Sequence, residues 1–152
     1  MSAPEERLAE LGLELPPVAP PAGDYVPAVV SGSFVYTSGQ VPFVDGELAV
    51  SGKLGIDVDI DEGRQGARAC TLNALAAVKS VVGDLGKVKR VVKVVGFVNS
   101  APDFSSQPQV MNAASELLGQ VFGDAGKHAR SAIGVAALPL NASVEVELIV
   151  EV

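Results

Sequence analysis

The sequence predicts an α+β fold in which a mixed β-sheet carries two helices on one face. Short, valine-rich runs of alternating apolar and polar residues indicate strands. Two longer segments repeat apolar residues at three- and four-residue spacing, which indicates amphipathic helices. The segments follow one another as two strands, a helix, a strand, a helix and two strands, so we expect both helices on the same face. The other face, rich in valine and alanine, then needs a cover from outside the chain.

The first part of the chain predicts a helix over residues 4–13 and a stiff, proline-rich linker over 16–23. We therefore expect residues 1–22 to precede a single domain formed by residues 23–152.

Two strands open this domain, at residues 26–30 and 34–37, on either side of Ser31-Gly32-Ser33. Asp45-Gly46 is typical of a tight hairpin turn.

A long helix is expected to begin with Asp61 as its N-cap and to end at Val82, before Gly83. Gly63 and Gly66 should weaken its first turns. Its predicted apolar stripe consists of Thr71, Ala74, Leu75, Val78 and Val82.

The second half of the domain starts with a valine-rich strand, residues 88–98, which we expect to be covered on both faces. The segment Ser106-Gln107-Pro108-Gln109 resembles a capping box at the start of a second helix. The last two strands are expected at residues 130–137 and 143–152. The predicted core positions of the second helix are Val110, Ala114, Leu117 and Val121.

Composition limits the functions that this chain can have. Its 152 residues, of which 48% are hydrophobic and 19% charged, can bury a substantial core, and the net charge of −7 disfavours binding to nucleic acid. Cys70 is the only cysteine and has no metal-ligand spacing around it, so we expect a core residue. The acidic N-terminus lacks an apolar signal region and no run is long enough to cross a membrane, which predicts a cytoplasmic protein. No metal-ligand cluster is visible, so no metal is expected.

Arg130 is the most informative residue. It opens A-R-S-A-I-G-V-A-A-L-P, where strand alternation places it on one face with the small residues Ala132, Gly134 and Ala136. A guanidinium beside a shallow apolar hollow suits a small carboxylic acid, because its planar fork of donors binds carboxylates in pairs. The alternative is an arginine that extends from the sheet edge or pairs with a nearby glutamate.

Four segments carry a family resemblance. They are G-D-Y-V-P-A-V from Gly23, Y-T-S-G-Q-V-P from Tyr36, V-V-K-V-V-G-F-V from Val91, and R-S-A-I-G-V-A-A-L-P from Arg130 followed by S-V-E-V-E-L-I-V-E-V. In this order and spacing they resemble the Rid family, the YjgF-like reactive-intermediate deaminases that are also called L-PSP endoribonucleases.

The resemblance implies a chorismate-mutase-like fold, a homotrimer with clefts between its subunits, and hydrolysis of small 2-imino or enamine acids to 2-keto acids and ammonia without a cofactor. The alternative is a trimer that binds a keto acid or an amino acid without turnover. A ribonuclease is disfavoured by the acidic charge. Ala132 stands where many Rid proteins have a cysteine, so the chain resembles a divergent branch that lacks thiol chemistry at this position.

The resemblance also implies roles for individual residues. Arg130 would bind the substrate carboxylate and Glu145 would position the attacking water. Tyr25 would close over the ligand, Ser38 would lie near the carboxylate, and Asn112 would face the ligand from the second helix.

Each of these residues also has a plainer interpretation. Glu145 shares one strand face with Glu147 and Glu151, and that face could simply be solvated. Tyr25 could be a half-buried aromatic residue, Ser38 a turn residue, and Asn112 an exposed helix residue.

His128, the only histidine, could reach the pocket of Arg130 and move protons, or it could be a loop residue. If the last two strands form a simple hairpin, Glu145 lies opposite about Gly134, roughly 13 Å along the sheet from Arg130. We therefore expect a second subunit to complete the site.

Overall fold

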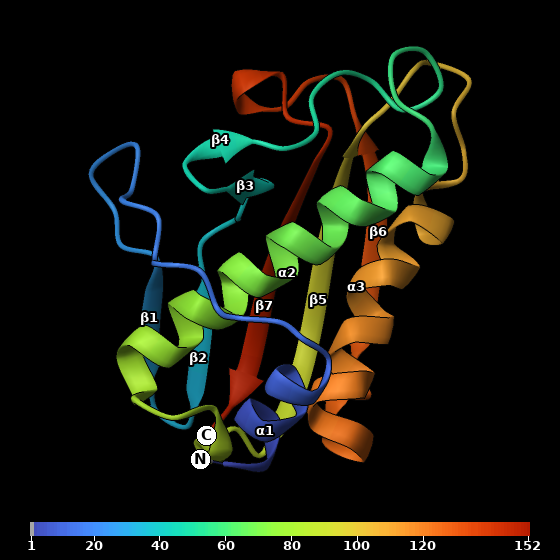
Figure 1. Ribbon diagram of the computed structural model, residues 1–152. Helices are drawn as coiled ribbons and strands as arrows, with labels where there is room; N and C mark the ends of the chain where they lie inside the picture. Colours follow the sequence, from blue (N-terminus) through green and yellow to red (C-terminus); the bar gives the residue numbers. More distant parts are fainter. Residues whose placement is uncertain (1) are drawn as a thin grey trace.

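A five-stranded mixed sheet forms the base of the fold (Figure 1). The computed structural model describes residues 2–152. The strand order of the sheet is β1-β2-β7-β5-β6, in which β5 and β6 are parallel and all other neighbouring strands are antiparallel. A separate hairpin, β3 (Phe43–Val44) with β4 (Glu47–Leu48), turns at Asp45-Gly46 as predicted. The strands of the sheet are β1 (Ala28–Ser31), β2 (Phe34–Thr37), β5 (Arg90–Asn99), β6 (Ala129–Val135) and β7 (Val144–Glu151).

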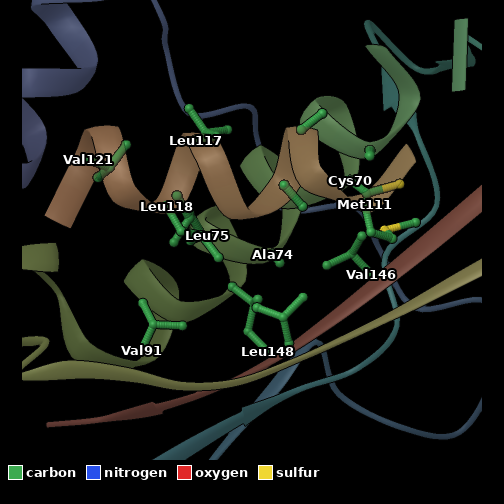
Figure 2. Packing of buried hydrophobic residues seen from close by; sticks show 14 of the residues in the cluster. Cys70, Ala74, Leu75, Val91, Met111, Leu117, Leu118, Val121, Val146 and Leu148 are labelled. Atoms are coloured by element: carbon green, nitrogen blue, oxygen red, sulfur yellow. The ribbon is translucent and has the colours of Figure 1, made fainter. Parts of the chain in front are cut away.

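Both long helices, α2 (Ile60–Val82) and α3 (Gln107–Phe122), cover the same face of the sheet, as the order of elements predicts (Figure 1). Their apolar stripes are buried because the sheet presents a matching apolar face. Figure 2 shows Leu75 of α2 and Leu118 of α3 packed above Leu148 of β7. The mixed α+β architecture is therefore as expected.

Strand alternation in β7 separates a core face from an open face. Val144, Val146 and Val150 are fully buried beneath the helices. Glu145 and Glu147 fall on the opposite, open face, because successive side chains of a strand point to opposite sides. The open face also presents apolar side chains that are 37–53% exposed: Val29, Phe34, Tyr36 and Ile133.

The start of α2 differs from the prediction. Its N-cap is Asp59 rather than Asp61, and Asp59 forms a reciprocal capping box with Glu62. Gly63 and Gly66 do not fray the helix, because both are buried. A Cβ atom at Gly63 would lie 2.9 Å from Leu54, and one at Gly66 would lie 2.9 Å from Val144, so these glycines let α2 approach its neighbours closely.

The predicted capping box at Ser106 is also wrong. Ser106 makes no side-chain hydrogen bond at the start of α3, and its backbone is not extended (φ −98°, ψ 30°). An extended backbone is what normally lets a capping side chain reach the free N–H groups of the first turn. The Gln107 amide instead donates to the Phe104 carbonyl at 2.8 Å.

The last two strands do not form a hairpin, which corrects the expected pairing. β5 lies between β6 and β7, and β7 pairs with β2 on its other side. Parallel strands need a long crossover, and α3 supplies it between β5 and β6. This crossover leaves β6 at the edge of the sheet, from which the chain returns through Pro139–Asn141 to the interior strand β7.

The N-terminal helix α1 (Ala3–Glu10), three residues shorter than expected at its C-terminal end, closes the lower end of the two-helix layer (Figure 1). Leu8 is buried in the core. Arg7 donates to the Val121 carbonyl at 3.0 Å in the last turn of α3, and Glu5 pairs with Lys79 of α2 at 2.7 Å. The N-terminal segment is therefore packed against both long helices.

Substitution by alanine should have opposite effects on stability at Gly119, within α3, and at Gly126, in the 3₁₀ turn that follows it. A Cβ atom at Gly126 would overlap the Leu118 carbonyl, which is backbone and cannot turn aside. At Gly119, inside α3, a Cβ atom would meet nothing within 4 Å. We expect Gly126→Ala to lower the free energy of unfolding by about 1–3 kcal/mol. Gly119→Ala should raise it by about 0.5–1 kcal/mol, through higher helix propensity. Urea unfolding of both variants measures the difference, and equal effects would contradict this packing.

Candidate functional site

Arg130 lies near the start of the edge strand β6, on the face that carries the helices. It pairs in register with Val94 of β5, which is fully buried beneath them. The predicted alternation is therefore confirmed: Ala132 and Gly134 share the face of Arg130. The side chain of Arg130 is partly exposed at this edge.

The guanidinium of Arg130 is held by neutral partners on α3. Its Nη1 donates to Asn112 Oδ1 at 2.8 Å and to Ser115 Oγ at 3.2 Å. Within residues 2–152, no carboxylate oxygen lies within 4.0 Å of a guanidinium nitrogen of Arg130, so Arg130 forms no ion pair there. Its positive charge is therefore positioned but not neutralised, which leaves it available to an anionic ligand.

His128 joins the same group of side chains. Its Nδ1 lies 2.6 Å from the Gly126 carbonyl and its Nε2 lies 2.9 Å from Ser115 Oγ. A carbonyl oxygen can only accept, so Nδ1–H donates to the Gly126 carbonyl, and Nε2 shares a hydrogen bond with the Ser115 hydroxyl. A continuous chain of hydrogen bonds therefore runs from Arg130 through Ser115 to His128.

The hollow expected beside Arg130 is partly filled from α3. Ala132 packs against the core. A Cβ atom at Gly134 would lie 2.7 Å from the Gln107 amide nitrogen and 3.1 Å from Ser100 Oγ. Glycine is thus needed where the strand approaches these polar side chains.

Glu145 lies in a second group of predicted residues, at the end of the sheet where β2 ends. It is half-buried, and its carboxylate packs so closely on Gly39 that a Cβ atom there would lie 2.8 Å away. Burial raises the pKa of Glu145, and the like charge of Glu147 raises it further. A carboxyl with a raised pKa suits proton transfer better than a fully solvated one.

Ser38 and Tyr25 belong to the same end of the sheet. Ser38 Oγ donates to the Val26 carbonyl at 2.6 Å, and the Ser38 backbone N–H donates to the Pro27 carbonyl at 2.8 Å. These bonds fix the Ser38-Gly39 segment beside Glu145. Tyr25, in the loop before β1, is 51% exposed.

The two groups lie on opposite faces of the sheet within one chain. Glu145 is level with Phe97 of β5 and Ile133 of β6, three residues beyond Arg130. That offset is about 10 Å along the strands and about 10 Å across two strands. The observed strand pairing differs from the expected hairpin, because β5 lies between β6 and β7. The expected separation of Arg130 from Glu145 remains, however, and one chain does not bring the two residues together.

Other features of the structure lie apart from both groups. Cys70 is fully buried, and burial raises the pKa of its thiol. Between residues 2 and 152, no cluster of three or more His, Cys, Asp or Glu side chains could hold a metal ion, and no helix is long and apolar enough to span a membrane. A hollow of about 450 Å³ at the start of α2 is lined by residues that include Asp59 and Asp61 but by none of the predicted site residues.

Sequence analysis missed Ser115 and Gly39. Ser115 follows Asn112 by three residues on α3, so helical periodicity already placed both on one face. Gly39 carried no sequence signal, because its contact with Glu145 depends on the bridge between Gln40 and Val146 that joins the end of β2 to β7.

Comparisons with known proteins agree with the fold and the motifs. Residues 5–152 match the family described as "YjgF/chorismate_mutase-like, putative endoribonuclease". The crystal structure of protein Atu1372 from Agrobacterium tumefaciens is 48% identical and superimposes with a TM-score of 0.92, covering 99% of this chain and 92% of that one.

Two curated relatives are similar over most of their length. Protein TCP17 of Trypanosoma cruzi is 47% identical over 145 residues, which are 95% of this chain and 91% of the relative. The 2-iminobutanoate/2-iminopropanoate deaminase of Dermatophagoides farinae is 37% identical over 137 residues, which are 88% and 91%. From the family match and these identities, this chain belongs to the YjgF-like family, the Rid family that its sequence resembles.

Proposed function

We propose that the protein hydrolyses small 2-imino acids, and their enamine tautomers, to 2-keto acids and ammonia. The observation that carries the proposal is the Arg130 guanidinium, which neutral partners hold in place without neutralising its charge. The similarity to a relative named as an imine deaminase supports the same chemistry. The match to Atu1372, which is described as having unknown function, adds support for the fold alone.

The proposed reaction needs few groups. Arg130 holds the substrate carboxylate through paired hydrogen bonds, and ionised Glu145 orients a water molecule toward the imine carbon. The water oxygen bonds to that carbon, protons move to the nitrogen, and the C–N bond then breaks, leaving a keto group and ammonia. No electrons are exchanged, so the reaction needs no redox cofactor.

We further propose that the site forms between subunits of a homotrimer. Arg130 and Asn112 belong to the edge strand and α3, whereas Glu145, Ser38 and Tyr25 lie around the open face and the end of β2. A neighbouring copy that covers the apolar open face can place the first group of one chain against the second group of another.

A non-catalytic protein that binds keto acids or amino acids is the second candidate. The exposed charge of Arg130 supports binding under either function, whereas the raised pKa of Glu145 favours catalysis. Cleavage of RNA is disfavoured by the net charge of −7, which repels a phosphate backbone.

If the open face is buried in a trimer, a charged substitution on that face should dissociate the trimer. Ile133 is 44% exposed there, whereas Ile56 is 66% exposed in the loop before α2. We expect sedimentation to give a trimer for the wild type and for Ile56→Glu. Ile133→Glu should dissociate it, because a buried carboxylate without a partner is strongly unfavourable. A monomeric wild type would contradict both the trimer and the shared cleft.

The catalytic assignment predicts two different losses of function. Arg130→Ala should weaken binding of pyruvate by about 2–4 kcal/mol, because one charge-assisted bidentate contact is lost. Glu145→Gln should retain binding but lower kcat by about 10²–10⁴-fold. Binding is measured by calorimetry, and turnover by ammonia release from imines that an amino-acid oxidase generates, with Glu151→Gln as the matched control. Unchanged turnover in Glu145→Gln would remove Glu145 from the mechanism, and a wild type that binds but does not turn over would support the second candidate.

The pH dependence follows from the environment of Glu145. Its pKa is raised, so this carboxyl ionises only above the ordinary glutamate value of roughly 4.3, and kcat/KM should fall as the pH drops through this higher value. Glu147→Gln should move this acidic limb to lower pH by removing the neighbouring like charge. The measurement is the pH profile of kcat/KM, corrected for uncatalysed hydrolysis. An identical acidic limb in Glu147→Gln would contradict the electrostatic assignment.

A further inference from the structure

We propose that the N-terminal segment, residues 2–22, positions Tyr25 over the ligand, and that it acts through the backbone N–H of Ala22. Ala22 is thereby a positioning residue, because its partner is Tyr25 and not the substrate. The inference rests on the proposed function, in which Tyr25 belongs to the same group of site residues as Glu145. It gives a role to a segment that the proposed reaction does not otherwise use.

The first part of this segment is fixed to the body of the domain. Leu8 of α1 is only 3% exposed, and Leu13 and Leu15 pack against the core beyond the end of the helix. An ion pair of Glu5 ties α1 to α2, and a hydrogen bond of Arg7 ties it to α3. The chain therefore has a defined position as far as Leu15.

The second part, residues 16–22, is a proline-rich strap. Figure 1 shows the chain between α1 and β1 crossing the helix layer to the loop before β1. Proline fixes its own φ and restricts the residue before it, so such a segment behaves as a semi-rigid spacer. The docking of α1 therefore limits where Ala22 can lie. The prolines of the strap are Pro16, Pro17, Pro20 and Pro21.

The strap ends against Tyr25. The Ala22 N–H donates to the Tyr25 hydroxyl oxygen at 3.4 Å, and Gly23 lies beside the ring, where a Cβ atom would be 3.3 Å from it. All residues from 20 to 26 are exposed, so burial in the core does not hold the tyrosine. Its position depends on Ala22 on one side and, on the other, on the bonds that Ser38 makes with the two residues after Tyr25.

The direction of the Ala22 bond suits a tyrosine that binds a ligand. An amide N–H can only donate, so the Tyr25 oxygen accepts and its own proton is available to another acceptor. The carboxylate oxygens of a 2-imino acid are acceptors of this kind. An exposed ring without such a tie has more rotamer freedom to lose on binding. The strap therefore lowers the entropic cost of closing Tyr25 over the ligand.

The direct test measures the mobility of the Tyr25 ring. The chain has two tyrosines and no tryptophan, so Tyr36→Phe leaves Tyr25 as the dominant fluorophore. In this background, Ala22→Pro removes the N–H donor, whereas Ala22→Ser keeps it. We expect the fluorescence anisotropy of Tyr25 to fall in Ala22→Pro and to stay unchanged in Ala22→Ser. Equal anisotropy in both variants would overturn the inference.

A second variant loosens the strap and keeps the donor. Replacing Pro20 and Pro21 together by glycine leaves the Ala22 N–H in place, and both prolines are exposed, so the core is not changed. This double variant should also lower the anisotropy of Tyr25. The matched control is Pro102→Gly, at an exposed proline outside the segment, which should have no effect. An equal fall in the control would contradict the role of the strap.

Turnover shows whether the position of Tyr25 matters to the substrate. We expect Ala22→Pro and Tyr25→Phe each to raise the KM for imine hydrolysis about threefold to tenfold, as for the loss of one neutral hydrogen bond, with kcat nearly unchanged. The two changes combined should raise KM no further than Tyr25→Phe alone, because Ala22 acts through the hydroxyl. Additive effects would show that Ala22 acts by another route.

The outcomes separate this inference from the proposed function. A wild type that releases no ammonia from imines would overturn the proposed function, and the anisotropy comparison would still decide whether the strap holds Tyr25. If the wild type is active and Arg130→Ala loses binding, but Tyr25→Phe leaves KM unchanged, the carboxylate site stands and the role of Ala22 is wrong. Circular dichroism and sedimentation check that each variant keeps its fold and assembly, so that a change in anisotropy reports on the ring.

Discussion

The parallel pairing of β5 with β6 is the constraint on which the rest of the structure depends. Parallel neighbours cannot be joined by a tight turn, so the chain between them forms α3 and crosses the sheet. The crossover packs α3 over the face of β6 that carries Arg130, which places Asn112 and Ser115 against the guanidinium. It also leaves β6 at the edge of the sheet and sends the chain back to the interior as β7. The parallel pairing of β5 with β6 therefore determines both the position of Arg130 and its distance from Glu145.

The two groups of candidate site residues have different electrostatic surroundings. Arg130 keeps a full charge and is surrounded by neutral hydrogen-bond partners, which hold it without competing for its ligand. Glu145 is half-buried against Gly39, and this burial, with the like charge of Glu147, raises its pKa. The fixed cation lies at the sheet edge and the carboxyl with a raised pKa lies on the opposite face. Because one chain keeps the two groups apart, we propose that another copy of the chain completes the site.

Much of this arrangement could be read from the sequence because it depends on local periodicity. Alternation in β7 separated Val146 from Glu145, and alternation in β6 placed Ala132 beside Arg130. The apolar stripes of the two helices followed from helical spacing in the same way. The motifs identified the family because they preserve the order of these elements. The cap of α2 at Asp59 was misplaced by two residues, since several acidic residues there could each have served as a cap.

The sequence by itself determined the elements, the face on which each side chain lies, and the family. Only the tertiary structure decided which strands are neighbours, and so it alone showed that β5 separates β6 from β7. It also joined residues that no local pattern connects, such as Gly39 with Glu145, and His128 with Ser115 and Arg130. The physical reason is that periodicity reports on the burial of one element at a time. Strand order and side-chain hydrogen bonds are instead set by the packing of the whole chain, in which a crossover helix and a few glycines allow close approach at particular points.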